Sequence, residues 1–224
     1  MSTEQKVKVV RAVVWMVIVV QILFLGYTAA NAQNPADILD KAARTYESAN
    51  GMQANFTLHT RSPQQGYAES FDGTIDMKGD KFTLKTPDMQ VWYDGKTMWT
   101  YVDRTEEVNI TTPTGEELQF TNPAILLGSY RSGFTPVYKG ESTSANSKAA
   151  YDIELIPRKK GDVQKVELQV EKISGLPSKI TVSMKNEVSS TIHIGQLKTN
   201  VSQPDSYFVF NKADFPGVEI VDLR

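Results

Sequence analysis

The feature that most constrains the fold of this chain is the alternation of apolar and polar residues that begins after Gly51. Phe71, Ile75 and Met77, for example, alternate with polar side chains, and the same period of two recurs through residues 164–170. Because successive side chains of a β-strand point to opposite faces, this period predicts strands with one buried and one solvated face. Strand–helix–strand alternation is not seen, which disfavours a parallel sheet.

Two segments depart from this period and predict helices. An asparagine followed by a proline at 34–35 is a typical helix start, and apolar residues then recur at helical spacing, so we expect a helix over residues 35–49. The same pair of residues precedes a short apolar stretch that ends near Gly133. A helix there is apolar almost all round and has to be covered by other elements.

An Asp-Gly pair at 94–95, flanked by alternating apolar residues, predicts a β-hairpin. A two-residue loop places Tyr93 opposite Lys96. With that register Trp92 and Trp99 fall on the same face of the hairpin.

The predicted fold class is mainly β, in one domain of about 200 residues, a size that all-β units reach. Further strands are expected at residues 151–156, 164–170, 178–184, 188–197 and 207–210. Turn residues separate these runs. About ten short antiparallel strands would form a strongly curved sheet with a concave apolar face, and the periodicity allows, without demonstrating, a cavity that the helices cap but do not fill.

The first 32 residues have the pattern of a secretory signal peptide. Basic residues precede an apolar run at 12–25, and small residues at 30 and 32 suit cleavage by a signal peptidase. An uncleaved membrane anchor is the alternative, but the run is shorter than the about 20 residues a spanning helix needs. We therefore expect residues 1–32 to be removed and residues 33–224 to form one domain. Because the chain has no cysteine, it cannot be lipidated as bacterial lipoproteins are, and we expect it to be soluble after export.

Motifs of catalysis and metal binding are absent from the sequence. There is no G-x-S-x-G, phosphate-binding loop or dinucleotide motif, and the two histidines occupy polar strand positions. Asp72 and Asp76 share a strand face, where a solvated pair is the simpler interpretation. We predict no catalytic residue, no metal and no cofactor, and hence no enzyme. The net charge of −2 argues against nucleic acid as a partner.

Residues 91–108, VWYDGKTMWTYVDRTEEV, resemble the signature of the periplasmic outer-membrane lipoprotein carrier family (LolA-like). Residues 53–57, 73–84, 122–127, 208–210 and 216–218 are similar to other segments of that family in the same order, so the resemblance covers nearly all of the predicted domain.

The resemblance implies an open, incomplete antiparallel β-barrel (a half-barrel) closed by a helical lid. It also implies a periplasmic chaperone that binds the acyl chains of lipoproteins in an apolar cavity. By the same resemblance, it would receive acylated lipoproteins from an inner-membrane ABC-type releasing complex and pass them to an outer-membrane lipoprotein acceptor. We expect the carrier to be a monomer.

Apolar residues on the expected strands and on the second helix are the candidate ligand-binding residues, with ordinary core packing as the alternative for each. They are Phe56, Leu58, Phe71, Ile75, Phe82, Leu84, Trp92, Trp99, Ile125, Leu126 and Leu127, of which Phe82 matches a family aromatic and the last three belong to the lid. One departure from the family concerns an arginine after the second strand that holds the lid closed. Here Lys78 is the nearest cation, and it lacks the planar fork of arginine.

Three other functions make different demands on the sequence. A lipid-sensing or envelope-stress regulatory module on the same half-barrel is the main alternative, although such regulators usually carry a second domain. A lipidated acceptor of the same pathway is disfavoured because cysteine is absent. A lipid hydrolase is disfavoured because no nucleophile–base pair is visible.

Overall fold

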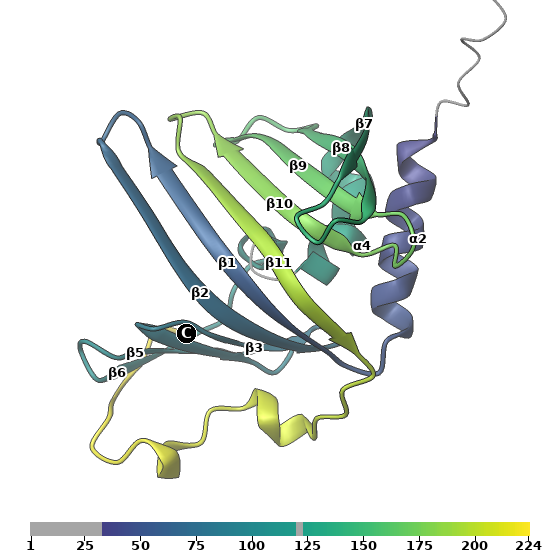
Figure 1. The fold of residues 1–224 in the computed structure, drawn as a ribbon. Helices are drawn as coiled ribbons and strands as arrows, with labels where there is room; N and C mark the ends of the chain where they lie inside the picture. Colours follow the sequence, from purple (N-terminus) through teal and green to yellow (C-terminus); the bar gives the residue numbers. More distant parts are fainter. Residues whose placement is uncertain (1–32, 120–122) are drawn as a thin grey trace, which may run out of the picture. The chain divides into compact units, whose positions relative to one another are not determined.

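One sheet of twelve strands carries the fold in this computed structural model, which describes residues 33–119 and 123–224. The order is β12-β6-β5-β4-β3-β2-β1-β11-β10-β9-β8-β7, so the sheet is open, with β12 and β7 at its edges (Figure 1). The strand bounds are β1 Met52–Ser62, β2 Tyr67–Lys78, β3 Lys81–Lys85, β4 Met89–Tyr93, β5 Met98–Val102, β6 Glu107–Thr111, β7 Phe134–Thr143, β8 Ala149–Pro157, β9 Val163–Glu171, β10 Pro177–Met184, β11 Ser189–Thr199 and β12 Glu219–Asp222.

The predicted mainly β, antiparallel fold class is confirmed. All neighbouring strands are antiparallel except β12, which pairs with β6 in parallel. The predicted signal peptide, residues 1–32, lies outside the described residues. Within the described residues, no helix is long and apolar enough to cross a membrane.

In the described part of the chain, three α-helices accompany the sheet: α2 at Pro35–Ser48, α3 at Gly115–Gln119 and α4 at Pro123–Gly133. The first agrees with the predicted helix over residues 35–49. Its Asn34 cap forms as expected, since the Asn34 side chain accepts a hydrogen bond from the backbone N–H of Ala36 at 3.1 Å. The last agrees with the predicted apolar helix, and Figure 1 shows α2 and α4 together beside β7–β10.

The core is most densely filled where α2 and α4 pack on the concave face of the sheet. Leu39 of α2 and Leu155 of β8 are completely buried there, together with Leu127 of α4. The apolar stripe of each helix meets the inward positions of the strands, which satisfies the expectation that the apolar helix must be covered.

The hairpin at β4 and β5 forms, but with a different loop. Tyr93 pairs with Met98 rather than Lys96, so the loop has four residues, 94–97. The carboxylate of Asp94 accepts hydrogen bonds from the backbone N–H groups of Lys96 and Thr97, both at 2.8 Å. This side-chain turn competes with the two-residue turn. The register shifts by two, so each side chain keeps its predicted face, and Trp92 lies opposite Trp99.

The strand predicted at residues 207–210 is wrong. Residues Asp205–Phe208 form a 3-10 helix, η2, and the following chain runs along the outer side of the sheet to a second one, η3, at Lys212–Asp214. Figure 1 shows this segment in yellow below β3, β5 and β6. Phe208 is completely buried, so its apolar character reflects packing onto the sheet rather than membership of it.

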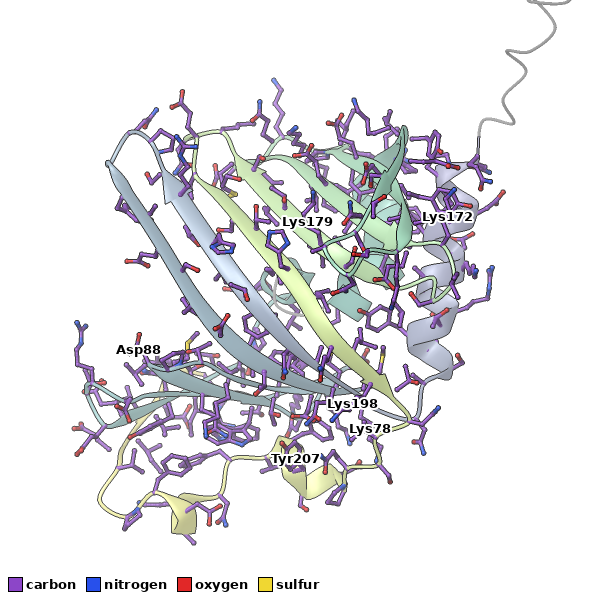
Figure 2. All side chains as sticks on the ribbon, viewed as in Figure 1. Lys78, Asp88, Lys172, Lys179, Lys198 and Tyr207 are labelled. Atoms are coloured by element: carbon purple, nitrogen blue, oxygen red, sulfur yellow. The ribbon has the colours of Figure 1, made fainter. Side chains whose placement is uncertain are left out.

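Two lysines of β2 and β3 form ion pairs with the start of this C-terminal segment. Lys78 and Lys81 donate to the two carboxylate oxygens of Asp205 at 2.9 and 2.7 Å, and the Tyr207 hydroxyl donates to buried Asp76 at 3.1 Å. Figure 2 shows Lys78 and Tyr207 close together. Lys78 therefore holds the C-terminal segment, and among the described residues it forms no hydrogen bond or ion pair with α2 or α4.

Candidate functional site

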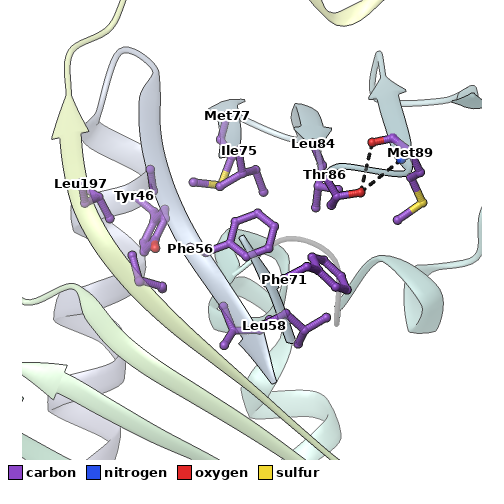
Figure 3. A pocket seen from close by; sticks show the side chains of 13 residues that line it. Tyr46, Phe56, Leu58, Phe71, Ile75, Met77, Leu84, Thr86, Met89 and Leu197 are labelled. Carbon is purple, nitrogen blue, oxygen red and sulfur yellow. Dashed lines mark hydrogen bonds between the residues drawn. The ribbon is translucent and has the colours of Figure 1, made fainter. Parts of the chain in front are cut away.

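The candidate site is a cavity of about 210 Å³ on the concave face of the sheet, beside the part that α2 and α4 fill. Strands β1, β2 and β11 supply most of its wall, and α2 contributes one residue, Tyr46 (Figure 3). The lining residues are Tyr46, Ala54, Phe56, Leu58, Phe71, Ile75, Met77, Leu84, Thr86, Met89, Ile192, Ile194 and Leu197.

Strand alternation brings these side chains to one face. On β1 the lining residues occupy every second position from Ala54 to Leu58, and the paired positions of β2 lie on the same face. Gly73 lies opposite Phe56, and a Cβ at this glycine would come within 2.4 Å of the Phe56 ring. Glycine at this position therefore allows the Phe56 ring to lie against the strand and form the cavity wall.

A β-bulge in β11 lets all three lining residues of that strand face the cavity. On β11 the lining residues Ile192, Ile194 and Leu197 are not all two apart. The register against β1 shifts between Ala54 and Phe56, which pair with Leu197 and Ile194. The extra residue on β11 reverses the alternation, so that Leu197 faces the cavity as the two isoleucines do.

Among the described residues, the cavity wall contains no carboxylate, lysine, arginine or histidine. Its polar groups are the hydroxyls of Thr86 and Tyr46. The Thr86 hydroxyl exchanges hydrogen bonds with the backbone of Met89, as the dashed lines in Figure 3 show. Such a wall binds apolar chains through burial alone and offers no nucleophile or acid–base pair.

Much of the lining is only half-buried. Six lining residues pack against the core while keeping part of their surface uncovered: Leu58, Phe71, Leu84, Met89, Ile192 and Leu197. Apolar area that the chain leaves uncovered in a concave wall is area that a ligand can cover, with a gain of about 25 cal/mol per Å².

The structure places five of the predicted ligand-binding residues in this wall: Phe56, Leu58, Phe71, Ile75 and Leu84. The prediction missed the contributions of α2 and β11. The helical spacing over residues 35–49 places Tyr46 on an apolar stripe but does not say what the stripe faces. The pairing of β11 with β1 leaves no local signal, because these strands are distant in the sequence.

Four other predicted residues lie on the concave side but not in the cavity wall. Phe82 is completely buried and packs against Tyr93, with ring centroids 5.4 Å apart. Leu126 and Leu127 are buried in the core under α4. Ile125 lines a second cavity of about 310 Å³ between α2, α4 and the turn that joins β2 to β3.

The predicted placement of Trp92 and Trp99 in the cavity is wrong. Both occupy the opposite face of the sheet, since their neighbours Val91 and Tyr93 pair with the inward-facing Leu84 and Phe82. There Trp92 belongs to an aromatic cluster with Tyr101, Phe210 and Phe215, whose adjacent ring centroids lie 4.7 to 5.5 Å apart. The C-terminal segment supplies the last two rings and covers this face.

The contact that holds α4 to α2 centres on Asp40. The hydroxyl of Tyr130 donates to the Asp40 carboxylate at 2.7 Å, and the guanidinium of Arg131 pairs with the same carboxylate. Hydrogen bonds from Arg131 and then Tyr130 lower the pKa of Asp40. Burial, followed by the hydrogen bond to Asp40, raises the pKa of Tyr130 to about 12. Asp40 of α2 thus holds the two helices together through Tyr130 and Arg131 of α4. This arginine lies on a helix, whereas the family resemblance implies one just after the second strand.

Comparison with known proteins shows the family. The profile described as outer membrane lipoprotein carrier protein LolA matches residues 25–187. The chain belongs to the LolA family. This family is one of carriers rather than enzymes. Among curated proteins, the chain is 26% identical over 195 residues to an uncharacterized protein of Methanocaldococcus jannaschii, covering 86% of this chain and 55% of that protein. The chain thus spans about half the length of this relative.

One solved structure shares the fold. An uncharacterized conserved protein from Thermus thermophilus superposes with a TM-score of 0.57 at 13% identity, covering 83% of this chain and 97% of that one. A LolA superfamily protein from Nitrosomonas europaea has a TM-score of 0.43 at 16% identity, with 80% and 99% of the two chains covered. At 13% identity, the likeness to the Thermus thermophilus protein concerns the fold alone.

Proposed function

We propose that this LolA-family protein is a soluble periplasmic carrier that holds the acyl chains of lipoproteins in the cavity between β1–β3 and β11. The single observation that carries this proposal is the cavity wall, which is concave, half-buried, and has no carboxylate, lysine, arginine or histidine among its lining residues. Each methylene moved out of water contributes about 0.8 kcal/mol. An acyl anchor therefore needs such a wall to cross an aqueous compartment, and it needs no reactive group.

The proposed pathway has two partners besides the cargo. An inner-membrane ABC-type releasing complex supplies the acylated lipoprotein, and an outer-membrane acceptor takes it. Because the cavity binds through non-directional apolar contact, cargo can leave without breaking a specific bond, which suits a carrier that must release what it binds.

A release assay tests this function. Membrane vesicles carrying the releasing complex and acylated lipoproteins are incubated with ATP and the purified protein, and the soluble fraction is analysed for a complex of the two. We expect a soluble one-to-one complex with the unmodified protein and none with Leu58→Asp, which puts a charge into the cavity wall.

The adjacent residue provides a matched control. His59 is exposed and points to the opposite face of β1, so His59→Asp introduces the same charge without touching the cavity and should preserve release. If lipoproteins remain in the vesicles while the protein still binds an apolar fluorophore, the carrier function is wrong and a lipid-sensing function replaces it.

A further inference from the structure

The hydroxyl of Tyr46 is a polar atom that the fold buries without a hydrogen-bond partner among the described residues. The side chain as a whole is only 6% exposed. Burying an unpaired hydroxyl costs free energy, and most such groups in folded proteins find a partner. Burial also raises the pKa of Tyr46, so the hydroxyl keeps its proton and remains a donor.

The position of this side chain relates the hydroxyl to the ligand site. Tyr46 lines both the main cavity and the second cavity between α2, α4 and the β2–β3 turn. Its ring therefore forms part of the wall between them. Figure 3 shows Tyr46 reaching from α2 in among the apolar side chains of the main cavity.

The two cavities differ in chemistry. The main cavity is apolar, whereas the second also has Glu47, Asp80 and Ser129 in its wall. The main cavity, about 210 Å³, is smaller than the roughly 300–1,000 Å³ of ordinary ligand sites, and the second cavity, about 310 Å³, adjoins it at Tyr46. An amphipathic ligand fits this arrangement, with its apolar chain on one side of Tyr46 and its polar part on the other.

We propose that the Tyr46 hydroxyl donates a hydrogen bond to the carbonyl oxygen of an acyl ester or amide whose chain lies in the main cavity. This inference rests on the proposed function and adds a specificity to it: the site selects acyl compounds over plain hydrocarbons. A carbonyl is the acceptor found at the junction between an acyl chain and its polar group, which is where Tyr46 lies. A bound water would also satisfy the hydroxyl, but would give no preference for an ester.

The test compares two ligands of equal length, methyl laurate and tetradecane, by displacement of an apolar fluorophore from the purified protein. Tyr46→Phe removes the hydroxyl and keeps the ring. We expect the unmodified protein to prefer the ester, and Tyr46→Phe to bind the ester roughly 3- to 10-fold more weakly while binding the alkane as before.

Ser62→Ala is the matched control. The Ser62 hydroxyl is likewise buried without a partner among the described residues, but Ser62 does not line the main cavity, so this variant should keep the ester preference. An unchanged ester preference in Tyr46→Phe would overturn the inference while leaving the binding function intact. Binding of neither ligand to the unmodified protein would overturn the proposed function itself.

Discussion

Around β4 apolar side chains lie on both faces of the sheet, but the described chain covers only one of these faces completely. On the outer face the C-terminal segment places Phe210 and Phe215 against Trp92, and the cluster is closed by the chain itself. On the concave face Leu84 and Met89 line a hollow that no part of the described chain fills. An apolar strand face therefore does not identify a ligand site, because what matters is whether another segment covers it.

The largest loss of stability is expected from a substitution on the outer face, which the C-terminal segment covers. Trp92→Ala should lower the free energy of unfolding by about 3–5 kcal/mol, because it opens a cavity in the aromatic cluster that the C-terminal segment closes. Urea denaturation measures this loss. Binding of an apolar fluorophore, expressed per folded molecule, should be unchanged, and a strong loss of binding would mean that the two faces are not independent.

A smaller effect on stability is expected within the concave face itself. Leu155 is completely buried under the helices, whereas Leu58 is half-buried in the cavity wall. Leu155→Ala should cost about 3 kcal/mol and Leu58→Ala less than about 1.5 kcal/mol, since a side chain beside a hollow has fewer neighbours to lose.

Ligand binding should respond in the opposite order. Leu58→Ala should weaken binding of an apolar fluorophore several-fold, and Leu155→Ala should leave it unchanged. If urea denaturation gave the same loss of unfolding free energy for Leu58→Ala and Leu155→Ala, the hollow beside Leu58 would be filled in solution.

The smallest effect concerns the attachment of the C-terminal segment. Hydrogen bonds from Lys81 and then Lys78 lower the pKa of Asp205 to about 2. Because the pKa of this carboxyl is lower in the folded protein than in the unfolded chain, ionised Asp205 stabilises the folded state at pH values above the unfolded pKa of roughly 3.9. That contribution is lost as the pH falls toward the folded value.

We expect Asp205→Asn to lower the urea midpoint at pH 7, with the difference from the unmodified protein shrinking between about pH 4 and pH 2. Asp214→Asn is the control, because this exposed carboxylate on the same segment accepts a hydrogen bond from Asn211 rather than from a lysine. A pH-independent difference for Asp205→Asn would indicate that its lysine contacts contribute nothing.

The periodicity of the sequence was sufficient for the fold class, for α2 and α4, and for the inward residues of β1 and β2. Some elements have weak signals: the pattern does not predict β6, β7 and β12, and it predicts a strand at residues 207–210 where the chain forms a 3-10 helix and an extended segment. The continuous run of aromatic and β-branched residues from Tyr207 to Phe210 is compatible with a strand, and only the contacts with Asp76 and with β3 determine that this segment lies across the sheet instead.

The candidate site was predicted only in part, for a related reason. Alternation correctly grouped Trp92 with Trp99 on one face, but it carries no information about which face of the sheet is concave. That information depends on where the C-terminal segment and α2 pack, and on the bulge in β11 that turns Leu197 inward. These are contacts between distant segments, which a local pattern does not encode.

The most direct test of the central claim is to locate a bound acyl chain by photo-crosslinking. A fatty acyl ester carrying a diazirine on its chain is bound, irradiated, and mapped by mass spectrometry of the digested protein. Labels in residues 54–58, 71–89 and 192–197 are the result we predict, since these segments line the main cavity. Labels concentrated in residues 92–101 and 207–215 would place the ligand on the outer face and contradict the account.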